Sequence, residues 1–583
     1  MSSSQSSPTA KRRFFRDLWR LTRIFWTSAD AKVGGLLLAL AVVLEFGTVY
    51  ANVLIAGAQR RIGDSLQEMD SAAFFAAMGF FFGYVVVFLL ASTYRIYVRQ
   101  RLEMRWRKSL TTHYLGKWMA PDAYVHSKLH SRDTDNPDQR IAEDIRNYVA
   151  SALGLSLSLL AAVATLVSFA GMLWVLSGDW PLKIGDLSIR VPGLMMWVAI
   201  AYALAASGLT HWVGRPLVPI NFDRLRVEAD FRYGLIRFRE NVEAVALARG
   251  EATERATSGA RFSRVVDNWH KLIAAQRNLG LFTGGIGQAS SVIPFLVAAP
   301  AYFAGHLTLG SLVQTRAAYG QVAGALTWFV NAYQEIAQWR ASIERLSAFS
   351  DTVKASHADR VKGADIQITS TTEPVVRIRD LRLNLPDGRV LLEGINGAME
   401  PGARIAIVGP SGTGKTTFFR AIAGIWPFGS GRIEVPREGR AVFLSHRPYL
   451  PIGSLRAAVA YPSAADAFPD EKIHEVLKSL ELGHLIAQLD ETRHWEQELS
   501  GDEQQRVIFA GVLLHEPGWL FMDDATAEIN ERMERRVYEL LAERMPRTAV
   551  ISITHREAVA AYHERRWILS PGSDGQPTQY QRA

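Results

Sequence analysis

The stretch Ile405-Ala-Ile-Val-Gly409-Pro-Ser-Gly-Thr-Gly414-Lys415-Thr416 decides the fold of the C-terminal part of the chain. Its apolar start predicts a strand, and the G-x-x-x-x-G-K-T pattern that follows is typical of a phosphate-binding loop leading into a helix. Glycines there let backbone N–H groups converge on phosphates, while the lysine reaches the outer phosphates and the threonine offers its hydroxyl to Mg²⁺. The expected nucleotide-binding residues here are Gly409, Ser411, Gly412, Gly414, Lys415, Thr416 and Thr417.

A second apolar run, Trp519–Met522, ends at Asp523 and Asp524. We expect Asp523 to lie beside Mg²⁺ together with Thr416, and Asp524 to polarise the attacking water. The alternative is a strand-end turn with two solvated aspartates, which the phosphate loop upstream disfavours. Short β-rich runs alternating with helical stretches predict an α/β domain with a largely parallel sheet. The further runs are Val375–Ile378, Ala441–Leu444 and Ala549–Ile553.

The composition of the 583 residues predicts a membrane part joined to this soluble part. The chain is 48% hydrophobic and 21% charged, with a mean hydropathy of +0.03, which excludes a disordered protein. It contains no cysteine. A disulfide scaffold, a cysteine-ligated metal site and a cysteine nucleophile are therefore excluded.

Several long apolar stretches lie before the phosphate-binding loop. Each has at least the roughly 20 residues that a bilayer span needs. A sixth, Leu312–Ala337, is weaker because it carries polar residues such as Gln314 and Arg316; it is either a soluble helix or a span whose polar face lines a water-filled cavity. The five stronger stretches are Val33–Ala58, Ala72–Tyr94, Tyr148–Leu176, Val191–Val213 and Leu279–Phe303.

Arginine and lysine set the expected orientation. They are concentrated between Arg99 and Arg146 and between Arg224 and Arg277, whereas the other links, 179–190 and 305–311, are nearly uncharged. The positive-inside rule then places both long segments and both termini in the cytoplasm, which requires six spans. The formal charge of +8 follows from this topology, so we expect a lipid bilayer and no nucleic acid as partner.

The N-terminal region predicts an amphipathic helix at the membrane surface. After a Ser-rich start, the stretch Phe14–Trp26 alternates apolar residues with arginines. A cleaved signal peptide would have a continuous apolar stretch, so we expect none. The expected organisation is a cytoplasmic tail and surface helix (1–30), a six-span domain (31–348), a polar linker (349–373) and a nucleotide-binding domain (374–583).

Further motifs carry a family resemblance over nearly the whole chain. Leu499-Ser-Gly-Asp-Glu-Gln-Gln-Arg506 resembles the signature sequence of ABC transporter ATPases, and Ile553-Thr-His555 resembles their switch histidine. The sequence of Phe443–Leu455, together with those of Asn136–Ile141 and Glu228–Asn241 in the membrane half, is most similar to one branch of that family. This branch contains peroxisomal fatty-acyl transporters of subfamily D and bacterial SbmA/BacA-type proteins fused to an ATPase.

The resemblance implies a type IV exporter-like half-transporter of the bacterial inner membrane that works as a homodimer and hydrolyses ATP with Mg²⁺. Its substrates would be peptide-like, cobalamin-like or long-acyl compounds. The resemblance also assigns site residues: Asp524 and His555 as catalytic, Thr416 and Asp523 at the metal, and Ser500, Gly501, Leu385 and His446 at the nucleotide.

The chain departs from the family pattern at several of these positions. His446 replaces a glutamine, Asp524 a glutamate, Asp502 a glycine and Asn530 an aspartate. A shorter carboxylate at 524 would hold water less well, and a charge at 502 would oppose the γ-phosphate of a partner. Slow hydrolysis is one expectation, and an ATP-binding gated or sensory membrane protein is the alternative function.

Glu45 lies within the first apolar stretch. A carboxylate in lipid is costly, so we expect it to face a cavity or a partner, or to pair with Arg316 or another cavity residue. The alternative is a packing or capping role without a part in transport.

Overall fold

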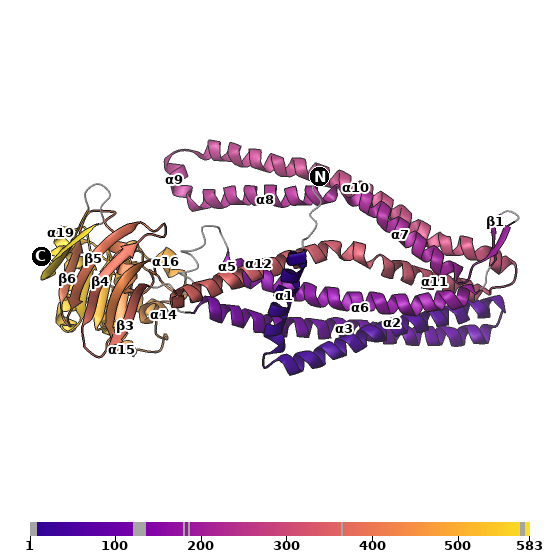
Figure 1. The fold of residues 1–583 in the computed structure, drawn as a ribbon, viewed down its shortest axis with the longest axis horizontal. Helices are drawn as coiled ribbons and strands as arrows, with labels where there is room; N and C mark the ends of the chain where they lie inside the picture. The colour runs from indigo at the N-terminus through magenta and orange to yellow at the C-terminus, as the bar shows by residue number, and fades with distance from the viewer. Residues whose placement is uncertain are drawn as a thin grey trace. The chain divides into compact units, whose positions relative to one another are not determined.

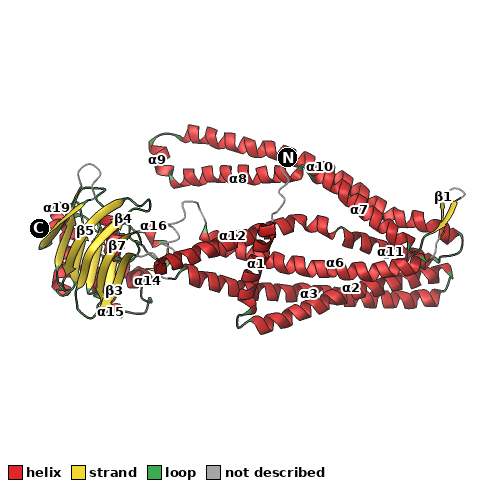
Figure 2. Cartoon of the chain, viewed as in Figure 1, coloured by secondary structure: helices red, strands yellow, loops and turns green. Residues whose placement is uncertain are grey.

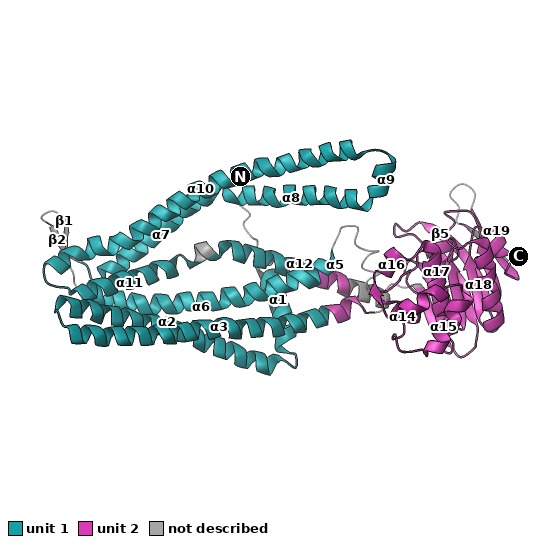
Figure 3. Ribbon diagram, turned by 180° about the vertical axis from the view of Figure 1, so that it is seen from behind, with its two compact units in different colours: residues 1–114, 136–348 teal, residues 115–135, 349–583 magenta. Residues whose placement is uncertain are grey.

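The computed structural model describes residues 8–120, 136–178, 181–184, 187–362, 365–571 and 578–582. The chain forms two compact units (Figure 3). The first comprises Met1–Tyr114 and Asn136–Ala348, and the second Leu115–Asp135 and Phe349–Ala583. The Ser-rich start, and Lys128 and Arg132 of the first basic segment, lie outside the described residues.

The first unit is helical (Figure 1) apart from one short hairpin, drawn as strands in Figure 2. Its elements are α1 (Pro8–Trp26), α2 (Ala31–Gln67), α3 (Ser71–Trp118), α5 (Pro137–Gln139), a π-helical turn (Arg140–Asp144), α6 (Ile145–Ser177), β1 (Pro181–Ile184), β2 (Leu187–Arg190), α7 (Leu194–Gly214), α8 (Leu217–Glu240), α9 (Val242–Leu247), α10 (Glu251–Phe303), α11 (Leu309–Leu326) and α12 (Trp328–Lys362).

Five of the described helices are long and apolar enough to cross a membrane, namely α2, α3, α6 with the turns before it, α7 and α10. The sixth apolar stretch is divided at Thr327 between α11 and α12. Helix α11 packs on α2, α6, α7 and α10 and buries Tyr319 and Val322 completely. Arg316 and Gln321 are exposed on its other side. Gln314 is buried, so the polar residues of this stretch are divided between the packed side and the exposed side of α11.

The start of α11 is fastened to the end of α2. Gly63 and Gly310 bring the two backbones together, and a Cβ on Gly63 would lie 2.6 Å from Cα of Gly310. The N–H groups at the start of a helix have no partner within it. Here the Leu309 N–H donates to Oε1 of Gln67 (2.6 Å) and the Gly310 N–H donates to Oδ1 of Asp64 (3.2 Å).

Helix α1 is amphipathic, as predicted from its sequence. Leu21 and Phe25 are fully buried, while Phe15 and Trp19 are 66% and 68% exposed. Phe25 stacks on Trp106 of α3, with ring centroids 5.5 Å apart. The apolar residues are thus shared between a face that packs on the bundle and a face available to lipid.

Glu45 is buried and forms an ion pair with Arg95 of α3, with Oε2 and Nη1 2.8 Å apart. The partner that the sequence suggested, Arg316, is instead exposed on α11. Helix packing determines this choice, because it turns Glu45 of α2 toward α3. Pairing with a cation lowers the cost of the carboxylate within the bundle.

The second unit is an α/β domain with two larger sheets and one two-stranded pair, β9 with β10. A six-stranded sheet has the order β14-β13-β6-β12-β11-β8 and a four-stranded sheet the order β3-β7-β4-β5. Between 349 and 373 the structure contains the end of α12 and strand β3, so the predicted linker has regular structure along most of its length. The strands are β3 (Asp365–Thr371), β4 (Val376–Asn384), β5 (Val390–Met399), β6 (Arg404–Val408), β7 (Gly429–Pro436), β8 (Ala441–Leu444), β9 (Gly453–Ser454), β10 (Thr492–Arg493), β11 (Trp519–Asp523), β12 (Ala549–Ile553), β13 (Arg565–Ser570) and β14 (Gln579–Arg582).

Short helices complete this unit. They are α13 (Lys415–Ile422), α14 (Leu455–Ala460), α15 (Asp470–Ser479), a 3₁₀ turn (Gly483–Gln488), α16 (Trp495–Glu498), α17 (Gly501–His515), α18 (Glu531–Arg544) and α19 (Glu557–Ala560).

Candidate nucleotide site

The parallel part of the six-stranded sheet gathers the candidate residues at one edge. Ile553 of β12 pairs with Ile407 of β6 on one side and with Asp523 of β11 on the other. Strand β8 pairs in parallel with β11. Since all four strands run the same way, the phosphate loop, Asp524, His555 and His446 follow their carboxyl ends, and Asp523 is the last residue of β11. This edge is where ligands bind in open α/β sheets.

The phosphate loop has the backbone that close approach to phosphates requires. Gly412 and Gly414 have φ angles of 84° and 88°, which disfavour residues with a Cβ. A Cβ on Gly409 would clash with the Leu569 carbonyl oxygen. The Lys415 ammonium donates to the carbonyls of Gly409 (2.6 Å) and Pro410 (2.8 Å). Lys415 is thus held over the loop whose N–H groups would receive the phosphates.

The electrostatics of the pair predicted for Mg²⁺ suit a hard cation. Burial raises the pKa of Asp523, and the neighbouring Thr416 hydroxyl opposes the rise. Burial also lowers the pKa of Lys415, against the effect of Asp524 and Asp523. One hydroxyl and one carboxylate in contact are ligands that Mg²⁺ accepts, so these residues fit the metal and the nucleotide.

The two predicted catalytic residues are also in contact. Asp524 has a φ of 49°, held by its N–H donating to the Ile553 carbonyl at 3.0 Å. Its Oδ2 lies 3.3 Å from Nδ1 of His555, and the two side chains are 25% and 64% exposed. A carboxylate and an imidazole therefore lie side by side next to Asp523, where both can reach a water molecule.

The signature segment forms the start of α17. Ser500 accepts from the Glu503 N–H (3.2 Å), and Glu503 accepts in turn from the Ser500 N–H (3.0 Å), which completes a capping box. Gly501 is the exposed first residue of the helix. Asp502 forms an ion pair with Arg506, four residues on. The charge that the sequence suggested would repel a γ-phosphate is therefore partly neutralised within its own helix.

The remaining predicted residues lie on two loops. His446 is exposed, two residues beyond the end of β8. Leu385 is half-buried in the turn between β4 and β5, where its N–H donates to the Arg389 carbonyl at 2.8 Å. Trp426 fixes this turn by donating from Nε1 to the carbonyl of Asn384 at 3.0 Å.

Some residues of the site region escaped the sequence analysis. Buried Gln505 of α17 accepts from the Glu528 N–H at 3.1 Å, which joins the signature helix to the segment after Asp524. Arg556, next to the switch histidine, donates to buried Glu534 of α18 (2.9 Å) and to the Thr526 carbonyl (3.4 Å). Burial raises the pKa of Glu534, against the effects of Thr526 and Arg556. The i,i+4 spacing of Asp502 and Arg506 was a usable signal, whereas these contacts are tertiary.

Asn530, the last of the departures from the family pattern, caps α18. Its side-chain oxygen accepts from the Met533 N–H at 3.0 Å. Asparagine and aspartate are equally good at this position of a helix. The substitution therefore preserves the local structure.

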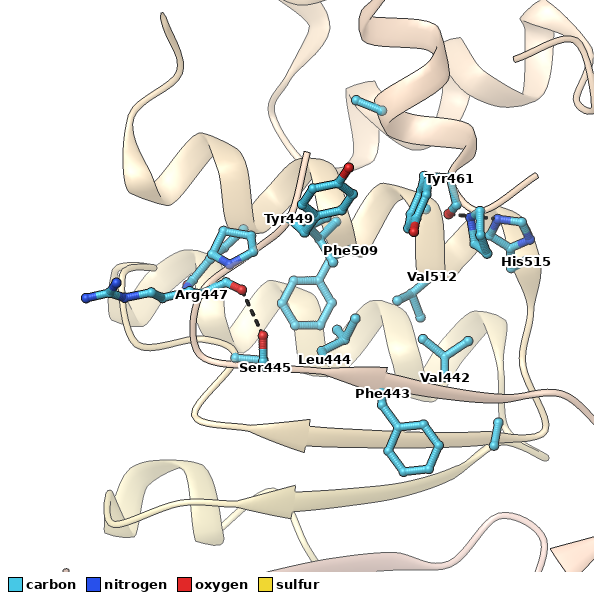
Figure 4. Close-up of a pocket in the computed structure, with 18 of the residues that line it drawn as sticks. Val442, Phe443, Leu444, Ser445, Arg447, Tyr449, Tyr461, Phe509, Val512 and His515 are labelled. Atoms are coloured by element: carbon cyan, nitrogen blue, oxygen red, sulfur yellow. Dashed lines mark hydrogen bonds between the residues drawn. The ribbon is translucent and has the colours of Figure 1, made fainter. Parts of the chain in front are cut away.

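A cavity of about 300 Å³ lies beside the end of β8 (Figure 4). Tyr449 and Tyr461 stand over it, with ring centroids 5.5 Å apart, and Phe509 of α17 forms part of its wall. His515 closes one side and bonds the Ala460 carbonyl at 3.0 Å. Gln505 and Ala525 also line it, so the cavity adjoins both the signature helix and the segment that follows Asp524.

This fold and this site together define an ATP-binding cassette half-transporter, with one helical membrane domain and one P-loop ATPase domain. Residues 21–303 match the family model described as ABC transporter transmembrane region 2, and residues 392–527 match the model described as ABC transporter. The chain belongs to the ABC transporter family. Its fold is similar to that of a bacterial Atm1-family ABC exporter with ATP bound, with a TM-score of 0.66 at 17% identity over 94% of this chain and 96% of that one.

Similar sequences include bacterial and plant proteins. An uncharacterized ABC transporter ATP-binding protein of Synechocystis is 33% identical over 92% of this chain and 81% of its own length. The inner membrane ABC transporter ATP-binding protein YddA of Escherichia coli is 28% identical over 92% of this chain and 94% of its own. The chloroplastic ABC transporter D family member 2 of Arabidopsis thaliana is 29% identical over 94% and 85%. The chain is thus related to subfamily D.

Proposed function

We propose that the chain is an ATP-driven transporter of the bacterial inner membrane that works as a homodimer, with six spans and with both termini and the ATPase domain in the cytoplasm. The observation that supports ATP hydrolysis is the placement of Lys415, Thr416, Asp523, Asp524 and His555 at one edge of the sheet, with Asp524 and His555 in contact. The homodimer follows from the single phosphate loop and single signature, since in this architecture each loop needs a signature from another ATPase domain.

Each residue then has a role. Bound Mg²⁺-ATP supplies a γ-phosphoryl group that can be transferred to water. Lys415 and the loop N–H groups neutralise phosphate charge, while Thr416 and Asp523 hold the metal. Asp524 would orient and polarise the attacking water. His555 would hold this water and the γ-phosphate in place. Ser500 and Gly501 of the partner subunit would close the site, His446 would assist at the metal, and Leu385 would contact the adenine.

Lys415→Ala tests this function directly. Purified full-length protein in proteoliposomes is expected to lose ATP turnover, because the substitution removes charge at the phosphates and no packing in the membrane unit. Lys478→Ala on α15, which removes an exposed lysine elsewhere on the ATPase domain, is the matched control. Turnover of Lys415→Ala at the parent rate would refute the proposal.

We further propose that the segments 136–144 and 239–250 pass the motion of the ATPase domain to the spans. Val242 and Leu247, at the ends of α9 within the second segment, are exposed apolar residues.

The proposed substrate class is broad: peptide-like, cobalamin-like or long-acyl compounds, as the resemblance of the sequence motifs implies. Uptake of a labelled panel of peptides and acyl-CoAs into vesicles, with and without ATP, distinguishes these classes and gives the direction of transport.

The alternative function is an ATP-binding gated or sensory protein with impaired hydrolysis. The observation that favours it is the set of departures at His446, Asp502 and Asp524. Tight ATP binding with background turnover in the parent protein would select it, whereas substrate-stimulated turnover would select the transporter.

A further inference from the structure

An open pocket of about 500 Å³ lies on the membrane unit where α1 leads into α2. Helix α3 forms most of its wall and Asp30 the remainder. Its lining contains three basic side chains and one acidic one, so the lining carries a net positive charge. The residues are Asp30, Tyr97, Gln100, Arg101, Met104, Arg105 and Lys108.

The basic side chains are held in place in different ways. Arg105 forms an ion pair with Asp30, with Nη1 and Oδ1 2.8 Å apart. The Arg101 guanidinium lies over the ring of Tyr97, 5.1 Å from its centroid. Lys108 is exposed one turn beyond Arg105. Asp30 thus offsets one of the three cations and orients it, which leaves Arg101 and Lys108 to attract an anion.

Helix α1 sets the depth of this pocket in the membrane. Its exposed Phe15 and Trp19 are suited to the boundary between headgroups and acyl chains, where amphipathic surface helices lie. Its end is tied to the level of Arg105, because Phe25 stacks on Trp106. An α1 lying at that boundary would bring the pocket to the height of the lipid phosphates.

The lining also suits a lipid rather than a small ion. Tyr97 and Met104 are exposed at 49% and 63% and present apolar surface beside the cations. A phosphodiester between Arg101 and Lys108 would leave its glycerol and acyl portions against these two side chains. Basic pockets of this kind on the cytoplasmic side of membrane helices bind anionic headgroups.

We propose that this pocket is a binding site for the phosphodiester headgroup of an anionic phospholipid of the cytoplasmic leaflet. Arg101 and Lys108 bind the phosphate, Arg105 is positioned by Asp30 to assist, and Tyr97 and Met104 contact the glycerol and the start of the acyl chains. The site lies outside the ATPase domain and does not depend on ATP hydrolysis or transport, whereas its place in the cytoplasmic leaflet rests on the topology proposed above.

Lipid binding to the purified full-length chain tests this directly. The protein in a non-ionic detergent is titrated with short-chain phosphatidylglycerol, phosphatidylcholine or glycerol 3-phosphate, and bound lipid is counted by native mass spectrometry. We expect the parent to prefer phosphatidylglycerol. The double variant Arg101→Gln/Lys108→Gln should bind it about 30-fold more weakly, because each basic residue near the surface contributes a factor of about five, with unchanged affinity for phosphatidylcholine.

Two further variants make the result specific. Arg255→Gln/Arg264→Gln removes the same charge from exposed positions of α10 and should bind like the parent. Arg101→Lys/Lys108→Arg keeps the charge and should retain the preference for phosphatidylglycerol. Parent-like affinity of the double glutamine variant, or equal loss in the α10 control, would overturn the proposal. Binding of glycerol 3-phosphate as tight as that of phosphatidylglycerol would overturn the lipid assignment in favour of a free phosphate-ester site.

Discussion

Lengthening the side chain at position 524 should accelerate ATP hydrolysis. Asp524 follows the residue expected at Mg²⁺ and lies 3.3 Å from His555, but its carboxylate is one methylene shorter than the glutamate found in the family. Asp524→Glu advances the carboxylate by about 1.5 Å. Misplacement of a reacting group by about 1 Å costs on the order of 100-fold in rate. We therefore expect turnover to rise by about 10- to 100-fold.

Removing the charge should have the opposite effect. Asp524→Asn keeps the shape but cannot accept a proton, so turnover should fall by about 100-fold or more, the usual contribution of a general base. The backbone gives an independent check, because φ at 524 is 49° and asparagine tolerates this region better than glutamate. The free energy of unfolding of Asp524→Glu should therefore be about 1 kcal/mol lower than that of Asp524→Asn, although its ATP turnover is faster.

The assay is phosphate release by full-length protein in proteoliposomes at saturating Mg²⁺-ATP, together with thermal unfolding of the same samples. Asp466→Glu, the same change at an exposed position, controls for the substitution itself. If both 524 variants hydrolyse ATP like the parent, Asp524 does not position the water, and that role passes to His555.

Three further outcomes are expected. Arg506→Gln leaves the Asp502 carboxylate without its cation and should destabilise the ATPase domain by about 1–3 kcal/mol. Asp502→Asn in the same chain should reverse part of this loss in thermal unfolding, because Arg506 also donates to the carbonyls of Leu480 and Glu481. Arg556→Gln frees Glu534 and the switch loop, so kcat should fall about tenfold with little change in the KM for ATP; a fall confined to KM would contradict this positioning role. Burial lowers the pKa of His563 to about 4, below its unfolded value, so the domain should lose up to about 3 kcal/mol as the pH falls from 6.5 toward 4, and His563→Gln should flatten this dependence.

The parts of the site that sequence could predict are those specified by local patterns. The phosphate loop has a fixed residue spacing after an apolar run, and a second apolar run ends at Asp523. The strands and the loop lie where these patterns predicted them. Contacts between distant segments carry no such signal. Glu45 pairs with Arg95 because the rotation of α2 turns it toward α3, and Arg556 pairs with Glu534 because α18 packs beside the loop that carries Arg556. The segment 349–373 was predicted as a linker because of its polar composition. An exposed helix end and an edge strand have the same composition, so composition alone does not distinguish them from a linker.

The junction between α2 and α11 limits how the membrane unit can open on the side where these two helices meet. Separating them would expose the N–H groups of Leu309 and Gly310, which Gln67 and Asp64 now satisfy, and would break a contact too close to admit even a methyl group. The pair should therefore swing as one rigid arm. If the bundle opens on its outer side, helix pairs other than α2 and α11 would then separate. Two spin labels, one on α2 and one on α11, should keep a constant distance throughout the ATP cycle.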